Sequence, residues 1–289
     1  MSMLELLQEA VLLSAEKLRI NNDLLLNKLH RHSSETRMLT NIMLGKKESW
    51  FMKLMVVGAS KGLGRAFVEG LCTAGDNVVG ISRLRPKELK LPDFVSLDWI
   101  EADLGTPLEA ALEIERQAPP ELDVLIYNLG VWEEMAFTDE YKFLDDSDES
   151  IVGMVNINIT GTILLLKRLI PKLLNSTNPR LILTGSTSGL RQSGRPEVTF
   201  GASKFALTGI GDALREGFRK DGLAVTCLQL GYLNTDDALS VPLDEAALRG
   251  DGQLVPVHDV VNVVNTLINM SSASYVRELV LPAIYDERF

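Results

Sequence analysis

The sequence of 289 residues predicts an α/β fold: a doubly wound parallel sheet in a single domain, with an N-terminal helical extension. Two observations predict this fold class. From residue 53 onward, short apolar runs alternate with segments of helical periodicity, as expected for strands that are buried on both faces. A glycine-rich turn also joins the first apolar run to the first helical segment.

The expected elements follow from this alternation. Strands are predicted at 53–57, 77–81, 94–99, 124–127, 180–184, 224–230 and 276–281. Helices are predicted at 62–73, 108–116, 148–174, 199–220 and 259–270. Strand–helix alternation of this kind implies a parallel sheet that is covered by helices on both faces.

Residues 1–51 differ from the domain predicted at 52–289. Leu4, Leu7 and Val11 begin a series of apolar residues at three-, four- and seven-residue steps, which predicts an amphipathic helical arm. Such an arm packs on the main domain, packs on a neighbouring subunit, or docks another protein. Met52 would also make a natural chain start, and in that case residues 1–51 are an accessory extension. These alternatives stay open.

The composition excludes several classes of function. The net charge is −10, from 29 Lys and Arg against 39 Asp and Glu, so nucleic acid and anionic membranes are unlikely main partners. The acidic N-terminus does not resemble a signal peptide, and no uninterrupted apolar run approaches the ~18 residues of a membrane span, which favours a cytoplasmic protein. Cys72 and Cys227 lie in apolar segments and are expected to be buried free thiols. Three scattered histidines do not suggest a metal site.

The glycine-rich turn is the strongest local signal, and its glycines follow the pattern GxxxGxG. Gly58 permits a tight turn, Gly62 lets the backbone approach a pyrophosphate, and Gly64 lets the helix pack close to the strand. The phosphates would then lie at a helix N-terminus, where free N–H groups favour negative charge. The sequence therefore predicts a Rossmann-like dinucleotide site.

Six later motifs follow this turn. They are Asp103-Leu104, Asn128-Leu129-Gly130, Asn158-Ile159-Thr160-Gly161, the serine motif 185–189, the helix motif 200–204, and Gly231-Tyr232-Leu233-Asn234-Thr235. In this order, and together with the turn, they resemble the short-chain dehydrogenase/reductase family over about residues 53–283. Leu230 stands where the family has proline in the last motif. The resemblance implies a Rossmann-like fold, a nicotinamide cofactor and a dimeric or tetrameric assembly. The implied cofactor-binding residues are Gly58, Ser60, Lys61, Gly62, Leu63, Gly64, Ser82, Arg83, Asp103, Leu104, Asn128, Gly130, Lys204, Gly231, Leu233 and Thr235.

The charges after the second strand favour NADP(H). Sites for NAD place a carboxylate there, whereas sites for NADP place a cation near the 2′-phosphate. Ser82, Arg83 and Arg85 follow the strand with no acidic residue among them, and Lys61 lies in the glycine turn. Arg83 and Lys61 are expected to bracket a 2′-phosphate.

The proposed catalytic residues are Ser186, Lys204 and Asn158, by resemblance. The family's proton donor is a Tyr four residues before the Lys, and this position is Phe200, which has no proton to give. Four explanations stay open: an artificial substitution, another donor such as Tyr232, Tyr127 or water, a substrate that needs no strong acid, or cofactor binding without turnover.

Two functions are consistent with these residues. The first is an NADP(H)-dependent oxidoreductase that moves hydride between the nicotinamide and a carbonyl or alcohol substrate. The second is a catalytically silent NADP(H)-binding subunit or sensor that acts through a protein partner, with the N-terminal arm as one contact.

Overall fold

The computed structural model describes residues 51–192 and 194–286. The predicted N-terminal arm lies, apart from Phe51, outside the described residues, so it stays a prediction.

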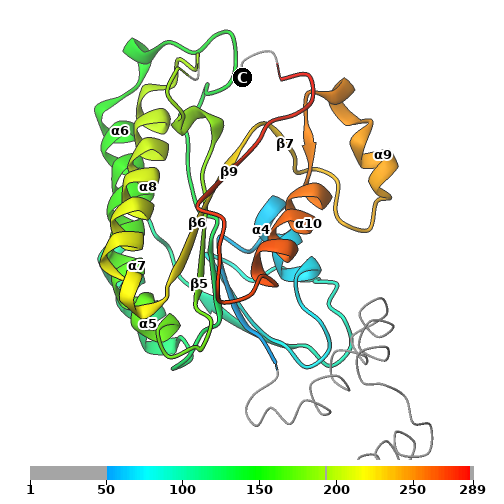
Figure 1. Cartoon of the computed structure of the whole chain (residues 1–289). Helices are drawn as coiled ribbons and strands as arrows, with labels where there is room; N and C mark the ends of the chain where they lie inside the picture. Colours follow the sequence, from blue (N-terminus) through cyan, green and yellow to red (C-terminus); the bar gives the residue numbers. More distant parts are fainter. Residues whose placement is uncertain (1–50, 193, 287–289) are drawn as a thin grey trace, which may run out of the picture. The chain divides into compact units, whose positions relative to one another are not determined.

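A seven-stranded sheet forms the centre of the fold, and all its strand pairs are parallel (Figure 1). Its strands are β1 Lys53–Val57, β2 Asn77–Ser82, β3 Ser96–Glu101, β4 Val124–Tyr127, β5 Arg180–Thr184, β6 Ala224–Leu230 and β9 Glu278–Leu281. The order across the sheet is β3-β2-β1-β4-β5-β6-β9. The predicted doubly wound α/β fold is therefore confirmed.

Helices cover both faces of the sheet (Figure 1). On one side lie α5 Pro107–Gln117, α6 Asp148–Val155, α7 Thr162–Leu173 and α8 Val198–Gly217, and on the other α4 Gly62–Gly70 and α10 Val257–Ile268. Successive strand residues alternate between two apolar cores: Met55 packs with α5 and α7, whereas Leu54 packs with α4 and α10. This alternation explains why the strands are apolar throughout.

Smaller elements complete the chain at the carboxyl ends of the strands and along their connections. These are η1 Phe143–Asp145, η3 Thr187–Gly189, η4 Arg219–Asp221, α9 Leu243–Ala247, η5 Arg249–Gly252, and the short pair β7 Leu233–Asn234 and β8 Val255–Pro256. The β7–β8 pair and α9 lie beyond β6, on the side of α4 and α10 (Figure 1).

The strand order reverses between β1 and β4. In a doubly wound sheet, the crevice for a ligand opens at the carboxyl ends of the two strands at this point. Gly58 follows β1 and Asn128 follows β4, so both belong to this crevice. The fold therefore brings together motifs that lie 70 residues apart in the sequence.

The predicted helix at 148–174 is observed as α6, a π-helical turn η2 Asn156–Gly161, and α7. A π-helical turn inside an α-helix often marks a functional position, and it contains Asn158. By length and composition alone, the stretch Asp148–Leu173 is long and apolar enough to cross a membrane. However, Leu165, Leu169 and Leu173 are fully buried against the sheet, as in the core helix of a globular domain.

Some boundaries differ from the predictions. The third strand begins at Ser96 rather than at residue 94, because Phe94 has a left-handed backbone (φ 66°) in the preceding turn. Helix α4 ends at Gly70 rather than at residue 73. The last strand begins at Glu278 rather than at residue 276.

Candidate active site

The glycine turn between β1 and α4 has no room for side chains. A Cβ atom on Gly64 would lie 1.9 Å from the carbonyl oxygen of Gly58, and one on Gly58 would lie 2.7 Å from that of Asn128. Gly58 (φ +80°) and Gly62 (φ +51°) also adopt left-handed backbones. A Cβ on Gly62 would lie 3.2 Å from Cβ of Thr235, so the turn is continuous with the segment after β6.

The N-terminus of α4 is suited to bind an anion. Its N-cap residue, Lys61, makes no capping hydrogen bond with its side chain, so the first N–H groups remain available. Ser60 is half-buried and Lys61 is exposed beside them. Leu63 is different, because its side chain is buried in the core and only its backbone faces the turn.

The carboxyl end of β2 carries two exposed cations, Arg83 and Arg85. Arg83 makes no ion pair with another residue that the structure describes, and the same is true of Lys61. Ser82 is buried, and its hydroxyl donates to the carbonyl of Leu84 at 2.7 Å, so it is already engaged. The remaining space beside β2 is therefore basic.

Sequence inspection missed an acidic residue beside this end of β2. Glu101, the last residue of β3, lies opposite Ser82 in the sheet. Its carboxylate accepts from the backbone N–H of Arg85 at 3.0 Å, which commits one of its oxygens to the loop. The segment 82–85 contains no acidic residue, but the carboxylate of Glu101 lies beside it. The distinction between a site for NAD, with a carboxylate, and a site for NADP, with a cation, is therefore less clear than the segment alone indicates.

Asp103 and Leu104 begin the connection from β3 to α5. The exposed carboxylate of Asp103 accepts from the N–H of Gly105 at 2.9 Å, which forms a tight turn. Leu104 is only 3% exposed and belongs to the apolar core. The turn, rather than the leucine side chain, is what this motif presents at the surface.

A cavity of about 310 Å³ opens beside the carboxyl ends of β4, β5 and β6. The expected site residues that line it are Asn128, Gly130, Ser186, Phe200, Lys204, Gly231, Leu233 and Thr235. The catalytic positions predicted from two separate motifs, 185–189 and 200–204, therefore meet in one place. Asn158 does not line the cavity.

Lys204 projects from α8 into this cavity and is buried. Its ammonium donates to the carbonyl of Thr184 at 3.1 Å, and a Cβ on Gly130 would lie 3.2 Å from Nζ. Burial in this site lowers the pKa of Lys204 from 10.5 to about 8. An amine with this pKa exchanges protons readily near neutral pH.

Phe200 lies one turn before Lys204 on the same face of α8. The centre of its ring is 5.4 Å from Nζ of Lys204, and the residue is only 5% exposed. The ring stands edge-on to those of Phe137 and Trp132. The position at which the resemblance places the family's acid is thus filled by an aromatic side chain that packs against two other rings.

Asn158 holds the walls of the cavity together rather than lining it. Its amide donates to the carbonyl of Val131 at 2.7 Å and to the hydroxyl of Ser203 at 3.1 Å, and its oxygen accepts from the N–H of Val131 at 2.9 Å. The π-helical turn therefore connects the segment after β4 to α8, next to Lys204.

Glu133 is a second positioning residue, and its role was not predicted. Its Oε1 accepts from the N–H groups of Thr199 at 3.0 Å and Phe200 at 2.9 Å, in the first turn of α8. The carboxylate is 1% exposed, and it caps the helix from a segment 66 residues away. It thereby helps to set the place of Phe200.

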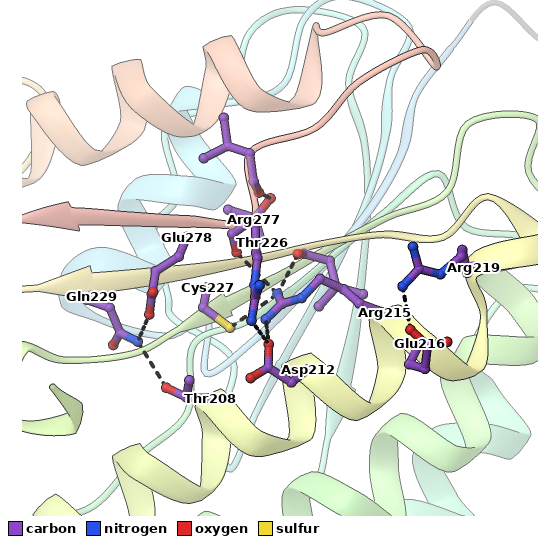
Figure 2. Close-up of polar contacts among 12 residues, drawn as sticks. Thr208, Asp212, Arg215, Glu216, Arg219, Thr226, Cys227, Gln229, Arg277 and Glu278 are labelled. Carbon is purple, nitrogen blue, oxygen red and sulfur yellow. Dashed lines mark hydrogen bonds and ion pairs between the residues drawn. The ribbon is translucent and has the colours of Figure 1, made fainter. Parts of the chain in front are cut away.

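Ser186 lies at the end of β5, and its backbone is held by a buried glutamine. The N–H of Ser186 donates to Oε1 of Gln229 at 3.1 Å. The other end of this amide donates to Thr208 on α8 at 3.0 Å and to Glu278 on β9 at 2.8 Å (Figure 2). Gln229 is 1% exposed, and Gly185 leaves space for it, because a Cβ there would lie 2.3 Å from Oε1.

Farther from the cavity, Figure 2 shows a second polar cluster between α8 and the edge of the sheet. Asp212 accepts from Arg215 at 2.6 Å and from Arg277 at 2.7 Å. The Sγ of Cys227 lies 4.0 Å from Nη1 of Arg215. Because Arg215 also donates to the carbonyl of Val225, this cluster stabilises the packing of α8 on β6.

The two alternative tyrosine donors differ in position. Tyr232 lines the cavity. Tyr127 is 1% exposed within the core, where burial raises its pKa to about 12, and it does not line the cavity. Of the two, Tyr232 alone is placed to meet a substrate.

Neither of the two cysteines lines the cavity. Cys72 and Cys227 are free and buried, as predicted, and burial raises the pKa of Cys72 to about 11. The described residues contain no group of three His, Cys, Asp or Glu that could hold a metal ion.

Comparisons with known proteins agree with this fold. A family profile described as short chain dehydrogenase matches residues 53–245, which is more than half of the chain. The chain belongs to this family of oxidoreductases, as the order of its motifs predicted.

Among curated relatives, the 3-oxoacyl-(acyl-carrier-protein) reductase FabG of Escherichia coli K12 is 24% identical over 197 residues, covering 67% of this chain and 78% of the relative. Among solved structures, the alcohol dehydrogenase from Thermococcus sibiricus complexed with 5-hydroxy-NADP has a TM-score of 0.62 at 18% identity, covering 81% of this chain and 97% of that one. The Pseudomonas aeruginosa RhlG/NADP complex has a TM-score of 0.63 at 18% identity, covering 82% and 96%. At these identities the structures show the common fold.

Proposed function

We propose that this chain binds NADP(H) and transfers hydride between its nicotinamide and a carbonyl or alcohol substrate. The observation that carries the proposal is the single cavity in which Ser186 and Lys204 meet, beside a glycine turn with no space for side chains. A turn of this shape at a helix N-terminus is suited to a pyrophosphate. The cavity then lies where the nicotinamide half of a dinucleotide would reach.

The residues at these positions are of the kinds that such a cofactor requires. The glycine turn and the first N–H groups of α4 would hold the pyrophosphate. Asn128 and Gly130 would border the ribose on the adenine side, and Thr235 would border the nicotinamide end. Bound there, the nicotinamide supplies or accepts the hydride. Lys204 would hydrogen-bond the ribose hydroxyls, and the hydroxyl of Ser186 would orient the substrate oxygen.

NADP(H) is favoured over NAD(H) by the charges beside β2. Arg83 and Lys61 are exposed cations without ion-pair partners among the described residues, and Arg85 adds a third positive charge. The carboxylate of Glu101 is engaged by the backbone of Arg85. Two of the structural neighbours were solved with NADP or a derivative, which supports the same choice.

Reduction of a carbonyl also requires a proton at its oxygen, and Phe200 cannot supply it. Two side chains on the cavity wall are candidate proton donors: Lys204, whose pKa is lowered to about 8 by burial, and Tyr232. Water is the third candidate donor. Loss of a positioned acid costs on the order of 10²–10⁴ in rate, whereas orientation of the hydride is retained. The chain is therefore expected to be a slow reductase.

The test compares the wild type with Phe200→Tyr, using NADPH titration and NADPH oxidation with a panel of ketones and quinones. We expect both forms to bind NADPH and Phe200→Tyr to turn over about 10²–10⁴ faster, because the acid is restored one turn before Lys204. Equal turnover would show that another donor already serves the site. Absence of NADPH binding in both forms would refute the proposal.

A second candidate is a silent NADP(H)-binding subunit or sensor. The observation that favours it is Phe200 itself, which is 5% exposed and packed edge-on against two other rings like a core residue. NADPH binding without turnover in either form of the protein would select this function. Co-purification of an active reductase would add to it.

Three accompanying expectations concern assembly and location. We propose a homo-oligomer, a dimer or tetramer, with residues 1–51 available to a protein partner, in the cytoplasm. Light scattering on the full chain and on a chain beginning at Met52 would show whether the N-terminal residues affect the assembly.

A further inference from the structure

Four aromatic side chains form one wall of the cavity, and we call Trp132, Phe137, Phe200 and Tyr232 the aromatic wall. The ring centres of Phe137 and Phe200 are 5.2 Å apart, and those of Phe137 and Tyr232 are 5.7 Å apart, both nearly perpendicular. Trp132 lies 6.0 Å from Phe137 and 6.4 Å from Phe200. The rings of Trp132 and Phe137 are tilted at 56°, and the other three pairs have the geometry of edge-to-face packing.

The mouth of the cavity is apolar and unusually exposed. Trp132 is 57% exposed although it lines the cavity, and Val131 and Met135, which are close to it in the sequence, are 38% and 43% exposed. An exposed indole on a cavity wall offers apolar surface that a ligand can cover. The segment after β4 therefore presents an apolar edge to whatever enters.

The arginine on the cavity wall is paired within the protein. Arg195 lines the cavity, but its guanidinium lies 4.3 Å from the ring centre of Tyr232 and 3.3 Å from the carboxylate of Asp286, and both charged side chains are 3% exposed. The described lining residues include no carboxylate. A ligand with its own charge would therefore find no counter-charge except the ammonium of Lys204, which already donates to Thr184.

We propose, on the basis of the proposed function, that the substrate is a neutral, planar aromatic carbonyl compound or the corresponding alcohol. Its ring contacts the aromatic wall, and its oxygen faces Ser186 and Lys204. Because the volume of about 310 Å³ also receives the nicotinamide, the ligand is a small ring system rather than a long chain. Phe200 then contributes to substrate binding at the position where the family has its acid.

The test compares ligands that differ only in aromaticity. Acetophenone and cyclohexyl methyl ketone have the same carbon skeleton and the same carbonyl group, but only the first has a flat ring with a π-system. Contacts of that ring with two wall residues are expected to give acetophenone about tenfold tighter binding. Equal affinities would overturn the proposal.

Binding is measured without turnover, so Phe200 does not limit the result. The double variant Trp50→Phe, Trp99→Phe leaves Trp132 as the single tryptophan, and its fluorescence reports ligand at the cavity mouth. In a second arm, saturation-transfer NMR compares the two ketones on Trp132→Leu and on the control Phe143→Leu. Phe143 is also an exposed aromatic residue, at 43%, but it does not line the cavity.

We expect Trp132→Leu to lose most of the preference for acetophenone and Phe143→Leu to keep it. An unchanged preference in Trp132→Leu would overturn the assignment of the aromatic wall. All titrations are run with and without NADPH. If NADPH binds but the ketones are not discriminated, the substrate class is wrong while the proposed function stands. If acetophenone is preferred but NADPH does not bind, the aromatic site stands and the proposed function fails.

Discussion

The glycine-turn end and the aromatic end of the crevice are built from different kinds of contact. At the turn after β1, backbone atoms touch where side chains would be: a Cβ on Gly64 would lie 1.9 Å from the carbonyl oxygen of Gly58. At the aromatic end, the cavity is shaped by side chains, among them Phe200 and Trp132. The first end tolerates almost no substitution, whereas the second can change its chemistry while the fold is kept.

On the proposed function, this difference accounts for a chain that belongs to this family and carries Phe200 where the resemblance places the acid. Replacing a hydroxyl at position 200 leaves a ring that packs well against Phe137, so it costs little stability. Nothing comparable is available at Gly64. The two ends should therefore respond differently to substitution, and the following predictions test that.

The largest effect is expected for Gly64→Ala. The added methyl would collide with the Gly58 carbonyl, which forces α4 away from β1. We expect NADPH affinity to fall by more than about 100-fold and the free energy of unfolding to fall by about 1–3 kcal/mol. Isothermal titration and urea denaturation measure the two quantities.

Gly209→Ala is the matched control, because a Cβ at this position of α8 would meet nothing within 4 Å. The Gly209→Ala substitution should raise the free energy of unfolding by up to about 1 kcal/mol, because alanine forms helices better than glycine does. If Gly64→Ala behaved like Gly209→Ala, the crowded turn would not be essential.

A smaller effect is expected at Gln229, whose amide accepts a hydrogen bond from the backbone of Ser186 at the aromatic end of the crevice. Gln229→Glu would place a carboxylate against that of Glu278 and remove the donor to both Glu278 and Thr208. The free energy of unfolding should fall by about 2–3 kcal/mol. Urea denaturation is again the measurement.

Combining Gln229→Glu with Glu278→Gln exchanges the two groups and restores complementary hydrogen bonding. The double variant should recover most of the lost stability, as a coupling energy in a double-mutant cycle. Simple additivity of the two single effects would contradict the contact seen in Figure 2.

The smallest effect concerns pH and Lys204. Because burial lowers its pKa from 10.5 to about 8, the unfolded chain binds more protons than the folded one between these values. Stability from this group therefore rises as the pH increases from about 8 toward 10.5, and it is lost as the pH falls back through about 8. The slope is at most about 1.4 kcal/mol per pH unit.

Comparing the wild type with Lys204→Met isolates this contribution, because all other titrating groups are shared. The difference in free energy of unfolding, measured at pH 8 and pH 9, should move in favour of the wild type at the higher pH. A difference that does not vary with pH would show that Lys204 titrates normally.

Much of the fold was predictable from local pattern. The strands β1, β4, β5 and β6 have the predicted ends, because each is a buried apolar run. Boundaries set by a turn, such as the left-handed Phe94 before β3, were not predicted, since a non-glycine residue in that conformation gives no clear signal.

The supporting contacts of the site were not predictable for a different reason. Glu133 caps α8 across 66 residues, and Gln229 holds Ser186 across 43 residues. A buried glutamate and a buried glutamine look, in the sequence, like surface residues within apolar segments. Their partners are backbone N–H groups, which every residue has and no motif marks.

The sequence by itself determined the fold class, the family, the glycine turn and the absence of a hydroxyl at Phe200, because periodicity and local spacing encode these features directly. Only the tertiary structure decided which side chains reach the cavity. It placed Tyr232 on the cavity wall and Tyr127 in the core. It also showed that Asn158, expected to be a catalytic residue, hydrogen-bonds Val131 and Ser203 and does not line the cavity. The physical reason is that orientation toward a cavity depends on how elements distant in the sequence pack, and that packing is settled by the whole core at once.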